Sequence, residues 1–172
     1  NNVKVRQAIR QAIDKRALVK TAWAGYGLRI GSFVPPTDPW YENLANRYPY
    51  DLAKSRQLLA EAGYPSGKGL EISLQLNNGG GRNLQMAEAV QSQLAKNLGI
   101  KVQLKQVEFA RHLDEVDAGK VEFFRLGWIA DYPDPESFLN LFYGKLVPTQ
   151  KDRPSPINHT RFQNADFDKL FE

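Results

Sequence analysis

Apolar residues follow a helical period in some parts of this chain and a strand period in others. A helical period runs through residues 3–23, with one apolar and one basic face, and a second predicts a short helix near residues 51–62. Asp51 is the expected N-cap of this second helix, and Gly63 its left-handed stop. Between these helices, residues 24–40 are rich in Gly and Pro, which predicts a long irregular connection.

The middle of the chain predicts three strands separated by helices. Period-two alternation marks residues 70–76 and 100–107, and the apolar stretch at 121–128 predicts a third strand. Helical spacing lies between them, at residues 84–99 and 109–119. This alternation implies parallel strands with right-handed crossovers, so the expected fold class is α/β, with a mixed, largely parallel sheet flanked by helices. Such sheets bind ligands beyond the carboxyl ends of their strands.

The stretch RLGWIADYPDPESFLNLF, residues 125–142, follows the third expected strand and mixes charges with aromatic rings. Asp131 stands between Trp128 and Tyr132, whose low-dielectric rings would strengthen its attraction to a cation. The alternative is a solvated loop Asp, which is common. Asp134 precedes a proline, an arrangement that caps a helix. Asp131 is then left without a partner carboxylate, so no paired acid/base site is predicted.

Other polar positions have both a structural and a functional interpretation. Arg125 lies inside an apolar strand pattern, where it either forms a salt bridge or recognises a ligand carboxylate. The loop LNNGGGRN matches neither a dinucleotide nor a P-loop motif and is interpreted as a mobile connection, although Arg82 and Asn83 lie at the strand-end surface. His112 has no second His or acid at metal-ligand spacing, so we expect it on the surface.

Composition narrows the function classes. The 172 residues contain no Cys and two His, so disulfides, thiolate zinc sites and Cys nucleophiles are excluded and no metal site is predicted. The net charge of +4 is spread over mixed acids and bases, so nucleic acid is not an expected partner. No apolar run reaches the ~20 residues of a membrane span. The chain starts and stops within helical patterns, and we expect a piece of a longer protein.

Four segments together resemble one known family: VRQAIRQAIDKRALV, YDLAKSRQLLAEAGYPSGKGLEISL, QSQLAKNLGIKVQLKQVEF and FFRLGWIADYPDPESFLNLF. In this order, from about Val3 to the C-terminus, they are similar to the dipeptide- and oligopeptide-binding class of extracytoplasmic solute-binding proteins, the receptors of peptide ABC importers. The resemblance implies that residues 1–172 are the single C-terminal ligand-binding lobe of a longer, two-lobe receptor. It also implies a periplasmic or extracellular location at the cytoplasmic membrane, with permease subunits as partners.

The resemblance further implies roles for residues at the strand ends. In the family's GW-x-A-D-Y-x-x-P element, the Asp binds the α-amino group of the peptide, and here that residue is Asp131. An Arg two residues before the Gly-Trp lies near the peptide's other end and corresponds to Arg125, while Trp128 and Tyr132 would shape the pocket. A His that some oligopeptide receptors use is not matched. Asn83 stands near its position, which leaves carboxylate recognition and peptide length open.

The predicted function is therefore peptide binding for an ABC importer by closure of two lobes, with no catalytic residue, metal or cofactor. One alternative keeps the receptor class and changes the cargo to a nickel chelate, haem, a sugar or another small solute. A small α/β hydrolase using Asp131 is an alternative from another class, disfavoured because no nucleophile or metal constellation accompanies this Asp. An interaction domain with a flat aromatic patch is a third.

Overall fold

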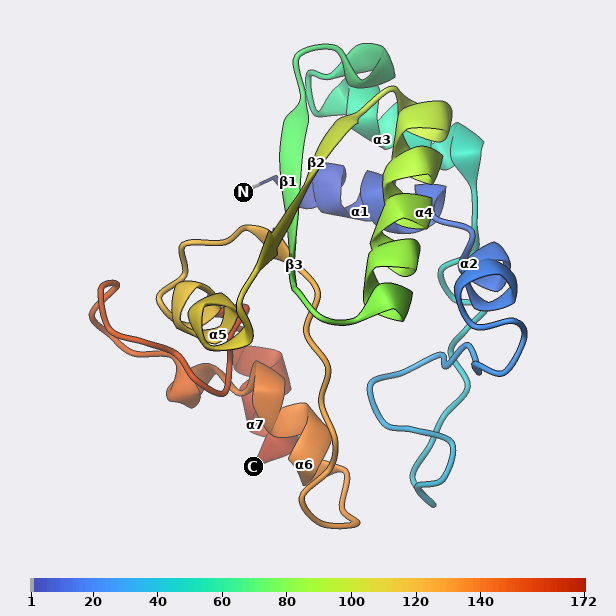
Figure 1. Cartoon of the computed structure of the whole chain (residues 1–172). Helices are drawn as coiled ribbons and strands as arrows, with labels where there is room; N and C mark the ends of the chain where they lie inside the picture. The colour runs from blue at the N-terminus through green and yellow to red at the C-terminus, as the bar shows by residue number, and fades with distance from the viewer. Residues whose placement is uncertain (1) are drawn as a thin grey trace.

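Three parallel strands organise the chain in the computed structural model, which describes residues 2–172. The strand order is β2-β1-β3, so the first strand in sequence lies at the centre (Figure 1). Glu71 pairs with Lys101 at one edge and Leu74 pairs with Phe123 at the other. The described residues thus contain the parallel part of the expected sheet, in strands β1 (Glu71–Asn77), β2 (Lys101–Val107) and β3 (Phe123–Phe124).

Two helices supply the crossovers and lie on opposite sides of the sheet (Figure 1). Helix α4 (Gly81–Leu98) joins β1 to β2 and packs on the side that buries Leu74 and Leu76. Helix α5 (Phe109–Asp117) joins β2 to β3 and contacts the side chain of Gln75, which points the other way because successive strand residues alternate between faces. The strand–helix alternation read from the sequence is therefore confirmed.

The helical period near the N-terminus divides into two helices, α1 (Val3–Ala12) and α2 (Lys15–Ala22). The break has a local cause, because the Asp14 carboxylate accepts hydrogen bonds from the N–H groups of Arg16 and Ala17 and starts a new helix. Helix α3 (Leu52–Glu61) lies against α1, where Ser55 Oγ donates a 2.6 Å hydrogen bond to the Ala8 carbonyl.

The buried core lies between α4, the N-terminal helices and β1 and β2. Its apolar members come from both regular periods recognised in the sequence, and each helix contributes one face. They are Ala8, Ala12, Leu58, Leu59, Leu74, Leu76, Ala87, Leu94, Leu98, Ile100 and Val102.

Two predicted helix boundaries are confirmed. Asp51 accepts a 2.9 Å hydrogen bond from the Lys54 N–H, and Gly63 adopts a left-handed φ of 92° after α3. The irregular connection at residues 24–40 is also confirmed, because no helix or strand occurs in that range.

The third strand is much shorter than predicted, because regular pairing covers only Phe123 and Phe124 of the expected 121–128. The Arg125 N–H still donates a 2.9 Å hydrogen bond to the Gln75 carbonyl. The Arg125 carbonyl, however, bonds the side chain of His112 instead of continuing the ladder along β1. Residues 125–130 are therefore not part of a strand.

The last third of the chain is a set of short elements tied together by aromatic rings. It contains α6 (Glu136–Leu139), α7 (Ala165–Phe171) and two single turns, Asn140–Phe142 and Gly144–Leu146. Asp134 accepts a 2.8 Å hydrogen bond from the Glu136 N–H, as expected of a helix cap. Phe33 from the irregular connection approaches Phe142 with ring centroids 4.2 Å apart, so both ends of the chain contribute to this cluster.

Nowhere in residues 2–172 does a helix combine the length and the apolar character needed to cross a membrane.

Leu94 tests the position of the core, since its side chain is fully buried on α4. Leu94→Ala should lower the free energy of unfolding by about 2–5 kcal/mol, because it removes apolar contacts and leaves a cavity. Urea denaturation measures the change. Leu170→Ala is the matched control, since Leu170 is 88% exposed and its truncation should cost less than ~0.5 kcal/mol. Equal losses in the two variants would contradict this core.

Candidate functional site

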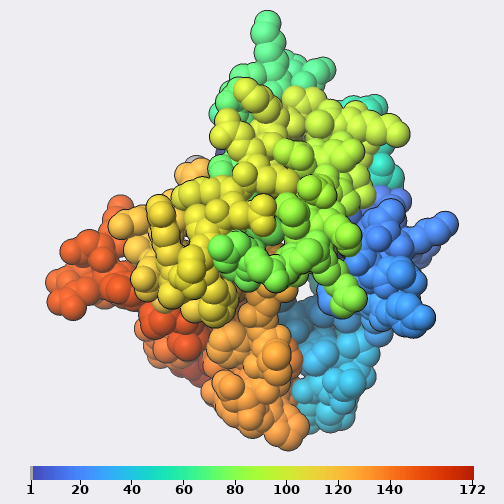
Figure 2. All heavy atoms as spheres, viewed as in Figure 1, coloured from blue at the N-terminus to red at the C-terminus, as the bar shows by residue number. Residues whose placement is uncertain are grey.

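The candidate site is the segment that leaves β3, residues 125–132, at the carboxyl edge of the sheet. The end of β1 and the start of α4 belong to the same edge. Figure 2 shows the orange part of the chain lying at the surface between α5 (yellow) and the connection after α2 (light blue). This is the position at which parallel sheets bind ligands.

Asp131 presents a carboxylate without a partner. Its residue is exposed, and no hydrogen bond or ion pair to its side-chain oxygens occurs within residues 2–172. The backbone of Asp131 is anchored to the protein interior, because its N–H donates a 3.2 Å hydrogen bond to Oγ of the fully buried Ser137. The carboxylate therefore stands on a fixed backbone and remains available to a ligand.

Tyr132 reports a negative potential around this carboxylate. Its hydroxyl donates a 3.0 Å hydrogen bond to Glu136, and the residue is 42% exposed. The pKa of Tyr132 is raised, first by this hydrogen bond, then by partial desolvation and by the charges of Glu136, Asp134 and Asp131. Three carboxylates thus act on one hydroxyl, a field that attracts a cation.

Arg125 and Trp128 are half-buried between the sheet and this acidic part of the segment. No carboxylate in residues 2–172 lies within 4.0 Å of the Arg125 guanidinium, so the salt-bridge interpretation finds no partner there. Its Nη2 lies 3.4 Å from where a Cβ on Gly127 would stand. The Trp128 Nε1–H is buried and, within the described chain, has no hydrogen-bond acceptor, which is uncommon for an indole.

Asn83 is on a different element from the other four predicted residues. It is half-buried in the first turn of α4, with its amide nitrogen next to Gly80. No hydrogen bond in residues 2–172 joins it to Arg125, Trp128 or Asp131. Four of the predicted residues thus lie on the segment 125–132, and Asn83 lies apart from them on α4. The neighbouring Arg82 lies over the ring of Trp23, 4.6 Å from its centroid.

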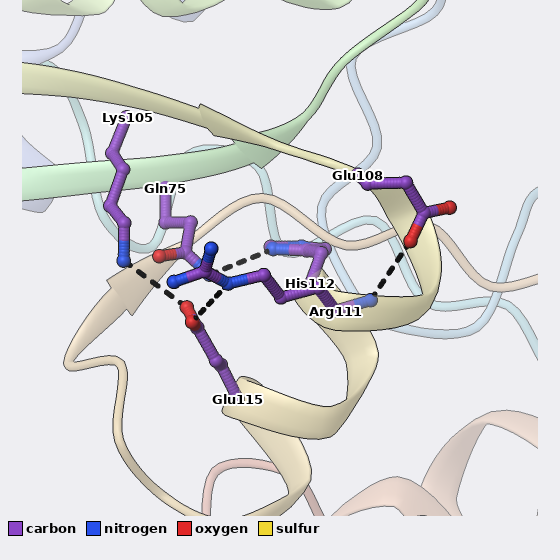
Figure 3. Close-up of polar contacts among 6 residues, drawn as sticks. All are labelled: Gln75, Lys105, Glu108, Arg111, His112 and Glu115. Atoms are coloured by element: carbon purple, nitrogen blue, oxygen red, sulfur yellow. Dashed lines mark hydrogen bonds and ion pairs between the residues drawn. The ribbon is translucent and has the colours of Figure 1, made fainter.

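His112 is fully buried, so its expected surface position was wrong (Figure 3). Its Nε2 lies 3.0 Å from the Arg125 carbonyl and its Nδ1 lies 3.3 Å from the Gln75 side-chain nitrogen. A carbonyl only accepts, so Nε2 carries the proton and Nδ1 accepts from the Gln75 amide. The side chain fixes the backbone at which the candidate segment begins. The signal in the sequence was its position four residues before the buried Val116, on the inner face of α5.

An ionic cluster lies beside Gln75 and His112 (Figure 3). Glu115 bonds Arg111 at 2.7 Å and Lys105 at 3.1 Å. The bonds from Arg111, Lys105 and Gln75, in this order, lower the pKa of Glu115 to about 2. The Gln75 nitrogen has the imidazole as its hydrogen-bond acceptor.

The chemistry available at this edge is binding. Within residues 2–172, no three His, Cys, Asp or Glu side chains gather closely enough to hold a metal ion. The segment offers a free carboxylate, a guanidinium with no acidic partner and an indole N–H without an acceptor. These groups match a small ligand that carries a positive end and polar groups along its length.

A parallel α/β unit with polar groups at the carboxyl edge of its strands is an arrangement that many small-ligand binding proteins share. More narrowly, the chain belongs to the bacterial extracellular solute-binding proteins of family 5, whose middle-region model matches residues 1–148. The family resemblance carried by the four sequence segments is thereby confirmed.

Similar proteins of known sequence and structure agree with this assignment. The chain is 34% identical over 172 residues to heme-binding protein A of Haemophilus influenzae, covering 99% of this chain and 30% of that protein. It is 31% identical over 166 residues to the dipeptide-binding protein of Escherichia coli K12, covering 95% and 31%. The solved DppA of Helicobacter pylori in complex with the peptide STSA matches with a TM-score of 0.83 and 29% identity, over 99% of this chain and 32% of that one. The chain thus spans about a third of the length of these relatives.

The His112 side chain can be tested by a replacement of similar size. His112→Phe should lower the free energy of unfolding by about 1–3 kcal/mol, because the Arg125 carbonyl and the Gln75 amide lose a buried partner. Chemical denaturation measures the loss. The double variant with Gln75→Leu should cost less than the sum of the two single variants, because both remove the same hydrogen bond. Strict additivity would argue against the network.

Glu115 gives this part of the fold a defined acid sensitivity. Its folded pKa, about 2, lies below the ordinary 4.5, so its bonds stabilise the fold fully above pH 4.5 and are lost as the pH falls towards 2. Wild type should therefore be more stable than Glu115→Gln at pH 7, and the difference should shrink between pH 4.5 and 2. Urea titrations at a series of pH values measure it. A difference independent of pH would refute the ionic role.

Proposed function

We propose that this chain is one lobe of a two-lobe receptor that binds peptides for an ABC importer outside the cytoplasmic membrane. The single observation that carries the proposal is the unpartnered Asp131 carboxylate at the carboxyl edge of a parallel sheet. Family membership and the likeness to a binding protein solved with the peptide STSA support it. Binding makes and breaks no bond, so the proposal needs no nucleophile or general acid.

Asp131 is the anchor for the positive amino end of the ligand. An ammonium group donates up to three hydrogen bonds, and a carboxylate that accepts them forms a charge-assisted contact about twice as strong as a neutral one. Asp134 and Glu136 add to the negative potential at the same place, as the raised pKa of Tyr132 records. The hydrogen bond from the Asp131 N–H to Ser137 keeps the anchor in position before the ligand arrives.

The remaining residues of the site take secondary roles. Arg125 has no acid partner in the described residues, so its guanidinium is free to bond the far, negatively charged part of a peptide. Trp128 and Tyr132 form walls beside the anchor, and Asn83 reaches the same edge from α4. Closure of a second lobe would exclude water and strengthen each of these contacts. The closed receptor then presents its cargo to the permease subunits.

Haem is the alternative ligand to consider, because one relative is named heme-binding protein A. A haem iron commonly takes a His ligand. Here His112 is fully buried and engaged on both ring nitrogens, and His159 lies 2.8 Å from Asp117. The exposed carboxylate favours a peptide amine.

Asp131→Asn in the complete receptor should weaken the binding of free-amine peptides by about 10- to 100-fold, because the anchor loses its charge at unchanged size. Isothermal titration with a defined tripeptide measures the affinity. N-acetylation of the same peptide should weaken binding to wild type and leave binding to Asp131→Asn nearly unchanged. That pattern identifies the amine as the partner of Asp131.

Asp134→Asn is the matched control, since it removes a nearby charge from a residue whose carboxylate caps α6. It should change peptide affinity by less than about threefold, the scale of an exposed charge effect. If both variants lost the same peptide affinity, Asp131 would act only through its long-range charge and not through direct contact with the amine. Unchanged affinity in Asp131→Asn would reject the anchor altogether. Haem titrated in the same assay measures the competing cargo.

A further inference from the structure

A cavity lies far along the chain from the candidate peptide site. It has a volume of about 300 Å³ and lies between the end of α1, the start of α2 and the connection that follows α2. Figure 1 shows α2 and this connection, blue to cyan, on the side of the sheet opposite α5. Its lining contains four cations and one carboxylate: Arg10, Lys15, Arg16, Arg29 and Asp14, with Tyr48 and Tyr50 among the other walls.

The positive charges in this cavity are not neutralised by the protein around them. The Asp14 carboxylate is engaged as the N-cap of α2, where it accepts from the N–H groups of Arg16 and Ala17 at 3.0 and 3.1 Å. None of the ion pairs within residues 2–172 involves any of the four cations. Burial, followed by the charges of Arg29 and Arg10, lowers the pKa of Lys15. The charges of Arg29 and Arg10 therefore disfavour the charged form of Lys15.

Arg10 and Arg29 are half-buried, and each keeps a buried Nε–H without an acceptor in the described chain. The Arg10 guanidinium carbon lies 3.7 Å from the centroid of the Tyr48 ring, so the group stacks by its face and leaves its N–H edge for another partner. One amino group of Arg29 donates to the Ala45 carbonyl. Nε of Arg10 and Nε of Arg29 are buried and have no acceptor within residues 2–172. The remaining N–H groups of both side chains belong to residues that line the cavity.

We propose that this cavity binds a phosphate group, either as the free ion or as the end of a small monoester. Two guanidinium edges and an ammonium supply several donors to one multiply charged oxyanion, the arrangement that phosphate recognition uses. A monocarboxylate would leave most of the positive charge unpaired. The tyrosine walls limit the space and lower the local dielectric, which strengthens the attraction. The site shares no residue with the segment at 125–132, so it does not rest on the proposed peptide function.

The test is a titration of the full-length protein with inorganic phosphate, against chloride at equal ionic strength. Isothermal titration and thermal unfolding should both show saturable binding. Arg10→Gln and Lys15→Gln should each weaken phosphate binding at least about tenfold, because each removes one charge-assisted contact. Phenyl phosphate in a parallel arm separates the two sources: tighter binding than phosphate indicates a monoester, and equal binding indicates the free ion.

Arg47→Gln is the matched control, since Arg47 is also near the Tyr48 ring, at 5.9 Å, but does not line the cavity. It should leave phosphate affinity unchanged, and all three variants should retain wild-type peptide affinity. The Lys15 side chain makes no hydrogen bond or ion pair within residues 2–172, so its variant reports on binding even if Arg10→Gln unfolds. Absence of saturable binding, or equal losses in Arg47→Gln and Lys15→Gln, would overturn the proposal.

Discussion

The hydrogen bond between His112 and the Arg125 carbonyl is the contact on which the geometry of the candidate site depends. It ends the pairing of β3 with β1 and directs residues 125–130 away from the sheet. The other ring nitrogen of His112 accepts from the Gln75 amide, and Glu115 with its two cations lies beside this pair. A buried polar network stabilises a fold only when each polar group in it has a hydrogen-bond partner. The position of the backbone at Arg125 therefore depends on side chains from other elements.

The charge distribution matters more than the net charge. A value of +4 describes a mildly basic chain, yet the residues around Tyr132 form an acidic region and the cavity beside Arg10 a basic one. Each region contains ionised side chains that the described protein does not pair. Unpaired charges of one sign raise the free energy of the folded state, and a ligand of the opposite charge relieves that cost. The two regions therefore favour ligands of opposite sign.

Local pattern predicted those parts of the fold whose stability is local. The alternation in β1 and β2, the cap at Asp51 and the strand–helix order follow from periodicity and capping chemistry, and the structure confirms them. The length of β3 and the burial of His112 were mispredicted, because both depend on Gln75, which is distant in sequence. Arg125, Trp128, Asp131 and Tyr132 were predicted together because they share one short segment, and their role stays a prediction. The relation of Asn83 to them depends on how α4 crosses the sheet, which no local pattern encodes.

Some buried polar groups of this fold are hydrogen-bonded within it, and others have no partner in the described chain. Ser55, Gln75 and His112 are fully buried, and each bonds an atom of another element. The free groups at Trp128 and at Arg10 are instead N–H donors beside an exposed segment and an open cavity. A buried donor without an acceptor costs about 1–3 kcal/mol, so a fold that keeps such donors at two separate surfaces gains most when acceptors arrive from outside. The binding free energy of those acceptors then includes the relief of a cost that the unliganded fold already carries.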